Sequence, residues 1–279
     1  MIEPFRILIL LYSAFFLASC ASKKINDIPY LTKSVAIVES FPKLTIFQAH
    51  DSEKKPVIVF IHGGYWNKGN KDMYKFLGRH FAKKGILTVI PNYTLSPKGN
   101  YNTMAREVAA AIKWTNENIS KYNGNPDQIF LMGHSAGGHL IALVGTNPKY
   151  LENTKIIKGI ILNDAAGLDM YSYLKEYPPK KDHNYDVTWT ENQDNWKDAS
   201  PINFLSKKIP PFLIYVGTKS FPSIISSNKD FVEKLNQYQP NVEINYLPKK
   251  HVAMMGQYLF PWNKHYKEIT EFIYLQNKI

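Results

Sequence analysis

A serine between closely spaced glycines is the residue of this sequence best suited to nucleophilic chemistry. Ser135 lies in the run G-H-S-A-G at 133–137, which matches the pattern G-x-S-x-G. The apolar run at 128–132 predicts a buried strand before it, and the small residues after it predict a helix. Glycines two positions before and after the serine permit the sharp strand-to-helix turn that exposes its side chain. The pattern therefore predicts that Ser135 is a nucleophile.

Two consecutive glycines after an earlier apolar run could supply backbone hydrogen-bond donors. Gly63 and Gly64 directly follow the strand expected at 56–61, and Tyr65 comes next. Exposed backbone N–H groups at such a place can bind the negative oxygen that develops when a serine attacks a carbonyl. We expect Gly63, Gly64 and Tyr65 to contribute to such an oxyanion hole, together with Ala136, which follows the nucleophile.

The elements around these motifs alternate between strands and helices, which is typical of an α/β fold. We expect a mostly parallel central sheet of about eight strands with helices on both faces, formed by residues 34–279. The aromatic and polar stretch 165–207 is expected to be an insertion after the sixth strand, over the active site. The expected strands lie near 35–38, 44–48, 56–61, 86–93, 128–132, 157–163, 211–216 and 242–247, and the helices near 70–84, 102–120, 224–237 and the C-terminus.

The motifs resemble those of the esterase branch of the α/β-hydrolase superfamily. H-G-G-x-W at 62–66, followed by G-H-S-A-G-G at 133–138, is similar to kynurenine formamidases, feruloyl-esterase-like (BD-FAE-like) proteins and the hormone-sensitive-lipase group. The run P-N-Y-T-L-S-P at 91–97 resembles their Y-R-L-S-P segment, with Thr94 in place of the usual arginine. The resemblance covers most of residues 35–275. It implies an α/β-hydrolase fold and hydrolysis of an ester or activated amide without a metal or another cofactor.

His251 is expected to be the general base. In this fold the base comes last in chain order, after the final strand. His251 lies in a loop four residues beyond the strand expected at 242–247, and its run H-V-A-M resembles the H-x-x-M around the family's catalytic histidine. His62 precedes the nucleophile and is expected to orient the glycine loop, whereas His265 is assigned to the final helix.

The acid departs from the family pattern. The resemblance implies an Asp or Glu at the end of a G-x-x-D run after the seventh strand, but this chain has G-T-K-S, which ends at Ser220. A hydroxyl group can accept a hydrogen bond from imidazole, but it adds no charge to stabilise an imidazolium. Asp164, at the end of the sixth strand as in some lipases, is the predicted replacement. Asp169, Asp230 and a serine–histidine dyad without an acid are the alternatives.

Aromatic side chains near the expected site could form a substrate pocket or could simply pack in the core. Trp66 and Tyr93 are the first candidates for an acyl or aryl site. The insertion adds further candidates, which are Tyr171, Tyr173, Tyr177, Tyr185 and Trp189.

The N-terminus resembles a bacterial lipoprotein signal. Residues 7–19 form an apolar run that is too short to span a membrane and suits a signal-peptide core. The run ends in L-A-S-C, which resembles a lipobox and implies cleavage before Cys20, a diacylglyceryl anchor on its thiol, and export. We therefore expect a signal peptide at 1–19, a tether at 20–33, and a membrane-anchored protein on the periplasmic side or the cell surface. An ordinary secretory signal or an uncleaved anchor is the alternative.

The formal charge of +11 does not indicate a nucleic-acid partner. Its lysines are spread along the whole chain and form no block of about five or more like charges. We expect a lysine-rich, solvated surface and no nucleic-acid binding. Cys20 is the single cysteine, so no intrachain disulfide can form.

The leading hypothesis is a serine carboxylic-ester hydrolase that forms an acyl-enzyme and acts on a small-molecule ester. A carbohydrate ester or another small carboxylic ester would suit an exported enzyme. An arylformamidase is the alternative within enzymes, because H-G-G-x-W resembles that family closely. A hydrolase-like fold that has lost turnover and serves in binding is the alternative of another class, and only the serine at 220 supports it.

Overall fold

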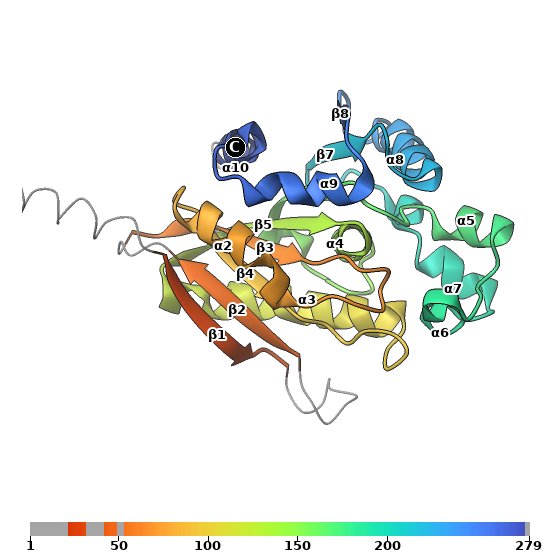
Figure 1. The fold of residues 1–279 in the computed structure, drawn as a ribbon, viewed down its shortest axis with the longest axis horizontal. Coiled ribbons are helices and arrows are strands. Elements are labelled where there is room, and N and C mark those ends of the chain that lie inside the picture. Colours follow the sequence, from red (N-terminus) through yellow and green to blue (C-terminus); the bar gives the residue numbers. More distant parts are fainter. Residues whose placement is uncertain (1–21, 32–41, 49–52, 277–279) are drawn as a thin grey trace, which may run out of the picture.

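The computed structural model describes residues 22–31, 42–48 and 53–276, and it contains one eight-stranded sheet. The strand order is β1-β2-β4-β3-β5-β6-β7-β8, and all neighbours run parallel except β1–β2 and β2–β4 (Figure 1). This confirms the expected α/β fold. The strands are β1 (Lys23–Pro29), β2 (Lys43–Gln48), β3 (Lys55–Ile61), β4 (Leu87–Pro91), β5 (Gly124–His134), β6 (Ile157–Asn163), β7 (Phe212–Gly217) and β8 (Ile244–Leu247).

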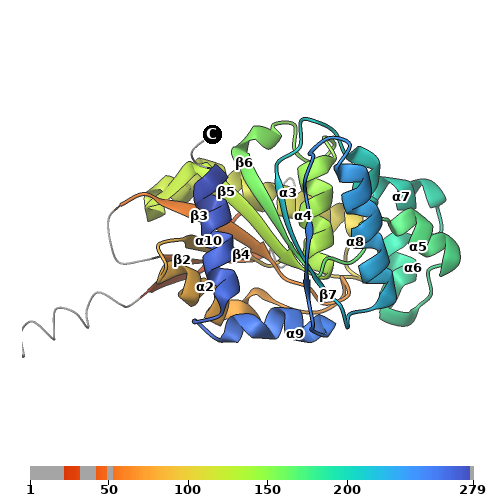
Figure 2. The ribbon, with the colours of Figure 1, turned by 90° about the horizontal axis from the view of Figure 1, so that it is seen from above.

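Helices cover both faces of this sheet (Figures 1 and 2), and strand β3 shows how the core divides between them. Val57, Val59 and Ile61 point to the face covered by α3 (Tyr101–Asn118), α4 (Ala136–Thr146) and α8 (Pro222–Leu235). Ile58 and Phe60 point to the face covered by α2 (Lys75–Ala82), α9 (His251–Gly256) and α10 (Lys264–Gln276). Alternate residues of a strand face opposite ways, so a strand buried on both sides must be apolar throughout. Short 3₁₀ turns complete these layers: η1 (Lys71–Tyr74), η2 (Ile119–Tyr122), η3 (Thr154–Ile156) and η6 (Gln257–Leu259).

The segment between β6 and β7 contains the expected insertion. Its short helices are α5 (Met170–Glu176), α6 (Tyr185–Trp189) and α7 (Gln193–Asp198), with the 3₁₀ turns η4 (Asp182–Asn184) and η5 (Pro201–Phe204). They form the end of the molecule farthest from β1 (Figure 1). Trp189 on α6 is fully buried and packs edge-on against Trp66, with ring centroids 4.7 Å apart. This contact joins the insertion to the glycine loop after β3.

The tether expected at 20–33 is wrong over residues 23–29, because these residues form the edge strand β1. The strand pairs antiparallel with β2, and the Lys71 ammonium group lies 2.9 Å from the Asp27 carboxylate. The run K-K-I-N-D-I-P has few apolar residues, and sequence periodicity therefore gave no strand signal there. The expected signal peptide, Cys20 and the strand expected at 35–38 lie outside the described residues. Within the described residues, no helix is long and apolar enough to cross a membrane.

Candidate active site

Ser135 lies on a strained turn between β5 and α4. Its backbone has φ 54° and ψ −122°, a region that non-glycine residues rarely adopt and that functional sites often use. A Cβ atom on Gly137 would lie 2.0 Å from the Ile61 carbonyl oxygen, and one on Gly133 would lie 2.6 Å from the Gly137 carbonyl carbon. Both positions therefore require glycine because backbone atoms approach them too closely, as the pattern predicts.

Replacing Gly137 with alanine should destabilise the protein. The added methyl group overlaps the backbone of β3, and such overpacking costs about 1–3 kcal/mol or more. Gly256 at the end of α9 is the matched control, because its Cβ would meet no atom within 4 Å. Gly256→Ala should leave the free energy of unfolding unchanged or raise it by up to about 1 kcal/mol. Urea unfolding of both variants measures this, and equal stabilities would contradict the steric argument.

A chain of hydrogen bonds links Ser135 to His251 and Asp164. The Ser135 hydroxyl lies 2.9 Å from His251 Nε2, and His251 Nδ1 lies 2.6 Å from Asp164 Oδ2. His251 is the first residue of the short helix α9 rather than part of the expected loop. The imidazole therefore faces the nucleophile with one nitrogen and a carboxylate with the other, which is the arrangement of a serine hydrolase triad.

Asp164 is fully buried just beyond the end of β6 and is held by several donors. Its Oδ1 accepts a hydrogen bond of 2.8 Å from the Gly217 N–H, and its Oδ2 accepts one of 2.5 Å from the Ser220 hydroxyl. The Asp164 N–H donates to the Tyr215 carbonyl at 2.8 Å. Together with His251, these contacts fix the carboxylate and satisfy both of its oxygens, which offsets the cost of burying a charge.

The other candidate acids lie elsewhere. Asp169 caps α5, where its Oδ1 accepts a hydrogen bond of 3.0 Å from the Ser172 N–H. Asp230 is exposed on α8. Ser220 stays within reach of the base, with its hydroxyl 3.4 Å from His251 Nδ1. The role of Ser220 as a donor to Asp164 was not predicted from the sequence. The signal that could have indicated it is the place of Ser220 at the family's usual acid position.

The glycine loop after β3 passes beside Ser135. Gly64 has φ 128°, where a Cβ would lie 2.1 Å from the Lys68 carbonyl oxygen, and Tyr65 has φ 53°. Among the described residues, the N–H groups of Gly64 and Tyr65 donate to no backbone carbonyl, and Ala136 is the first residue of α4, where an N–H has no partner within the helix. Gly63 also borders the nucleophile, since a Cβ there would lie 3.1 Å from the Ser135 Cβ. Gly63, Gly64, Tyr65 and Ala136 therefore remain the predicted oxyanion donors.

The prediction that Tyr93 lines the pocket is wrong. Its ring stacks on the His62 ring at 4.5 Å, and its hydroxyl donates to the His62 carbonyl at 2.9 Å. The side chain therefore packs beneath the glycine loop, where its hydroxyl is satisfied. His62 orients the loop as expected, since its Nδ1 donates to the Gly63 carbonyl at 2.9 Å.

Three buried histidines around the loop are neutral. Burial lowers the pKa of His62, His134 and His139 to about 4 each. For His139 the hydrogen bonds show why, since Nδ1 accepts from the Trp66 indole at 3.1 Å while Nε2 donates to the Ala199 carbonyl at 2.7 Å. A proton on Nδ1 would face the indole N–H and break this contact.

The lowered pKa values of these buried histidines predict that the protein loses stability in mild acid. Between about pH 4 and 6.5 the unfolded chain binds more protons than the folded one, so the unfolding free energy falls as pH falls. Each histidine contributes a slope of up to about 1.4 kcal/mol per pH unit. Replacing His139 with glutamine should make the dependence shallower by that amount. Urea titrations at several pH values measure it, and parallel curves for the two proteins would contradict the prediction.

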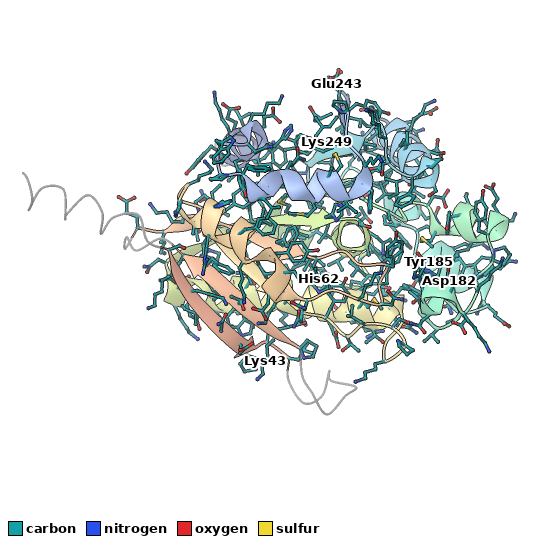
Figure 3. The ribbon with its side chains drawn as sticks, viewed as in Figure 1. Lys43, His62, Asp182, Tyr185, Glu243 and Lys249 are labelled. Carbon is teal, nitrogen blue, oxygen red and sulfur yellow. The ribbon has the colours of Figure 1, made fainter. Side chains whose placement is uncertain are left out.

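A cavity of about 500 Å³ opens next to Ser135 and His251. Trp66 lines it, as predicted, with Tyr65 beside it. Insertion residues form much of the remaining wall, and Figure 3 labels two of them, Asp182 and Tyr185. Of the aromatic candidates, Tyr173, Tyr177 and Tyr185 line the cavity, whereas Tyr171 and Trp189 do not. Within the described residues, no group of His, Cys, Asp and Glu side chains is arranged to hold a metal ion.

Comparison with known proteins identifies the family. The BD-FAE family model matches residues 44–235. The chain belongs to this family of α/β-hydrolase esterases. The assignment confirms the resemblance carried by H-G-G-x-W and G-H-S-A-G-G.

Individual relatives agree with this assignment. The chain is 30% identical over 200 residues to the probable carboxylic ester hydrolase LipM of Mycobacterium tuberculosis, a match that covers 65% of this chain and 45% of LipM. It is 38% identical over 225 residues to the probable isoprenylcysteine alpha-carbonyl methylesterase ICMEL2 of Arabidopsis thaliana, covering 73% and 52%. The chain thus spans about half the length of these relatives. A truncated carbohydrate esterase from gut microbiota has the same fold, with a TM-score of 0.76, 21% identity, and 94% and 98% of the two chains covered.

Proposed function

We propose that the protein is a serine carboxylic-ester hydrolase. The observation that supports this most directly is the unbroken line of hydrogen bonds from Asp164 through His251 to Ser135, which ends at an open cavity. Membership of an esterase family and the strained backbone of Ser135 point the same way.

In the proposed cycle, the Ser135 oxygen attacks the carbonyl carbon of the ester while its proton passes to His251 Nε2. The Asp164 carboxylate stabilises the imidazolium, and the N–H groups of Gly64 and Ala136 face the oxyanion. The ester C–O bond then breaks, and the alcohol leaves with the proton from His251. Water attacks the acyl-enzyme in the same way, which releases the carboxylic acid and restores the serine.

The cavity wall suggests a substrate with a small or flat acyl group and a polar leaving group. Tyr65, Trp66 and Tyr185 supply aromatic surface. Asp169 and Asp182 on the insertion supply hydrogen-bond acceptors for hydroxyl groups. An ester of a carbohydrate or of another small hydroxylated alcohol fits this combination.

Labelling with a fluorophosphonate probe tests the proposed function, because the probe reacts only with an activated serine. The wild type should be labelled, and Ser135→Ala should not. An unlabelled wild type would favour the hydrolase-like binding protein instead. Rates on p-nitrophenyl acetate, longer acyl esters, acetylated sugars and N-formylkynurenine would then rank ester classes against the arylformamidase alternative.

We also propose that Cys20 carries a lipid anchor and that the protein is exported to the periplasmic side or the cell surface. The apolar run at 7–19 and its L-A-S-C ending support this. Incorporation of an alkyne-tagged fatty acid into the wild type, but not into Cys20→Ser, is the expected result. Equal incorporation into both would reject the anchor.

A further inference from the structure

An apolar surface begins beside the catalytic base. We call it the α9 strip, and its exposed members are Val252, Ala253, Leu259, Phe260, Pro261 and Trp262. Val252 and Trp262 are each 78% exposed, and Leu259 and Phe260 are 53% and 51% exposed. No residue from 252 to 262 carries a charge. The exposed members fall in two groups, 252–253 at the start of α9 and 259–262 from the end of η6. Exposed apolar side chains are usually scattered singly, so these groups indicate contact with something apolar.

The strip is a fixed part of the fold. On its inner side Met254, Met255 and Tyr258 pack into the core. The Met254 carbonyl accepts a hydrogen bond of 3.0 Å from buried Asn163, and His80 on α2 lies 3.2 Å from the Tyr258 carbonyl. Figure 2 shows α9 along the lower edge of the molecule. The outer apolar face is therefore presented by a packed segment.

Basic residues lie around the strip. Lys219, Lys249 and Lys250 cluster at its His251 end, where the Lys219 N–H donates to the Lys249 carbonyl at 3.1 Å. Figure 3 labels Lys249 beside α9. In the described part of the chain, none of these three lysines lies within ion-pair distance of a carboxylate, whereas Lys264 at the other end pairs with Glu268 at 3.1 Å.

We propose that the α9 strip binds the surface of a bilayer that contains anionic lipids. Exposed aromatic and aliphatic side chains at a protein surface enter the boundary between headgroups and acyl chains, as those of amphipathic surface helices do. Lysines that flank them attract acidic headgroups. The Phe260 and Trp262 rings, 5.5 Å apart, supply the aromatic anchor, and Lys249 and Lys250 supply the charge.

This orientation would place the cavity mouth next to the lipid surface. His251 is both the first residue of α9 and a lining residue of the cavity. Phe221, which is half exposed, also lines the cavity and meets the His251 ring edge-on at 5.2 Å. The inference stands on the strip and its charges, and it requires neither the lipid on Cys20 nor ester hydrolysis.

Fluorescence quenching by brominated lipid tests the proposal directly. Trp262 is highly exposed, whereas Trp66, Trp189 and Trp196 are buried, and Trp114 lies in the opposite core layer. The full chain is mixed with vesicles of brominated phosphatidylcholine with and without phosphatidylglycerol, both as wild type and as Cys20→Ser, which cannot be lipidated. We expect quenching in the anionic vesicles for both proteins and its loss in Trp262→Phe.

Charge variants test the electrostatic part. Lys249→Gln/Lys250→Gln should weaken binding of the Cys20→Ser protein to anionic vesicles by at least about tenfold, and added salt should do the same. Lys121→Gln/Lys155→Gln is the matched control, because these lysines lie in η2 and η3 at the amino ends of β5 and β6. The control should bind like the parent protein.

Three results would overturn the proposal. They are absence of quenching in anionic vesicles, quenching that persists in Trp262→Phe, and equal binding to neutral and anionic vesicles. A dimer that shields Trp262 and does not bind vesicles would assign the strip to a second copy of the chain instead.

Discussion

Replacing Asp164 with asparagine should lower kcat by about 10⁴, with little change in KM for a small ester. The Asp164 carboxylate lies 2.6 Å from His251 Nδ1 and is the buried charge that stabilises the imidazolium. An amide in its place is neutral, and its NH₂ group can turn the imidazole to the wrong tautomer. Steady-state hydrolysis of p-nitrophenyl acetate measures the loss.

The alternative acids provide the controls for this experiment. Asp169→Asn and Asp230→Asn should keep nearly the full rate, because one caps α5 and the other is exposed on α8. Circular dichroism and urea unfolding of Asp164→Asn separate a chemical loss from a folding defect. A folded Asp164→Asn protein with the wild-type rate would reject Asp164 as the acid and favour a serine–histidine dyad.

Moving the carboxylate to position 220 should restore much of the lost activity. The Ser220 hydroxyl lies 3.4 Å from His251 Nδ1, so an aspartate there could reach the same nitrogen. We expect Asp164→Asn/Ser220→Asp to recover on the order of 100-fold in kcat over Asp164→Asn, since the charge returns but its supporting donors do not. The kcat of the double variant relative to that of Asp164→Asn measures how well an acid at position 220 can replace one at position 164.

The single variant Ser220→Asp is the control for this swap. It places a second carboxylate beside Asp164 and His251, and the added negative charge favours the protonated form of the imidazole. The acid limb of its pH–rate profile should therefore move to higher pH than in the wild type. A double variant no faster than Asp164→Asn, with a native unfolding curve, would show that only the end of β6 can hold the acid.

Local sequence pattern was sufficient for much of the fold and for part of the site. Apolar runs such as 128–132 become buried strands because both sheet faces are covered, and the glycines around Ser135 report a close backbone approach that the chain cannot avoid. The order of motifs along the chain was enough to single out His251. These features depend on neighbours a few residues away or on the general layout of the fold.

The remaining features depend on contacts between distant segments. Asp164 was predicted as the acid only by its resemblance to some lipases, with three alternatives left open, because no local pattern reports that the end of β6 lies beside β7 or that Ser220 and Gly217 donate to its carboxylate. Tyr93 turns inward because its hydroxyl finds the His62 carbonyl. The polar strand β1 forms because it pairs with β2 and because Asp27 forms an ion pair with Lys71. The composition of the strand itself indicates neither contact.

The contact between Trp66 and Trp189 has a consequence for how specificity can change. Trp66 belongs to the loop that carries the oxyanion donors, and it also donates a hydrogen bond to His139 on α4. Swinging α6 outward as a hinged cover would therefore pull on the catalytic loop itself. We therefore expect substrate specificity to change through substitutions in the cavity wall, at positions such as Tyr177 and Asp182. The Trp66–Trp189 pair stays unchanged, because it holds the loop that carries the oxyanion donors.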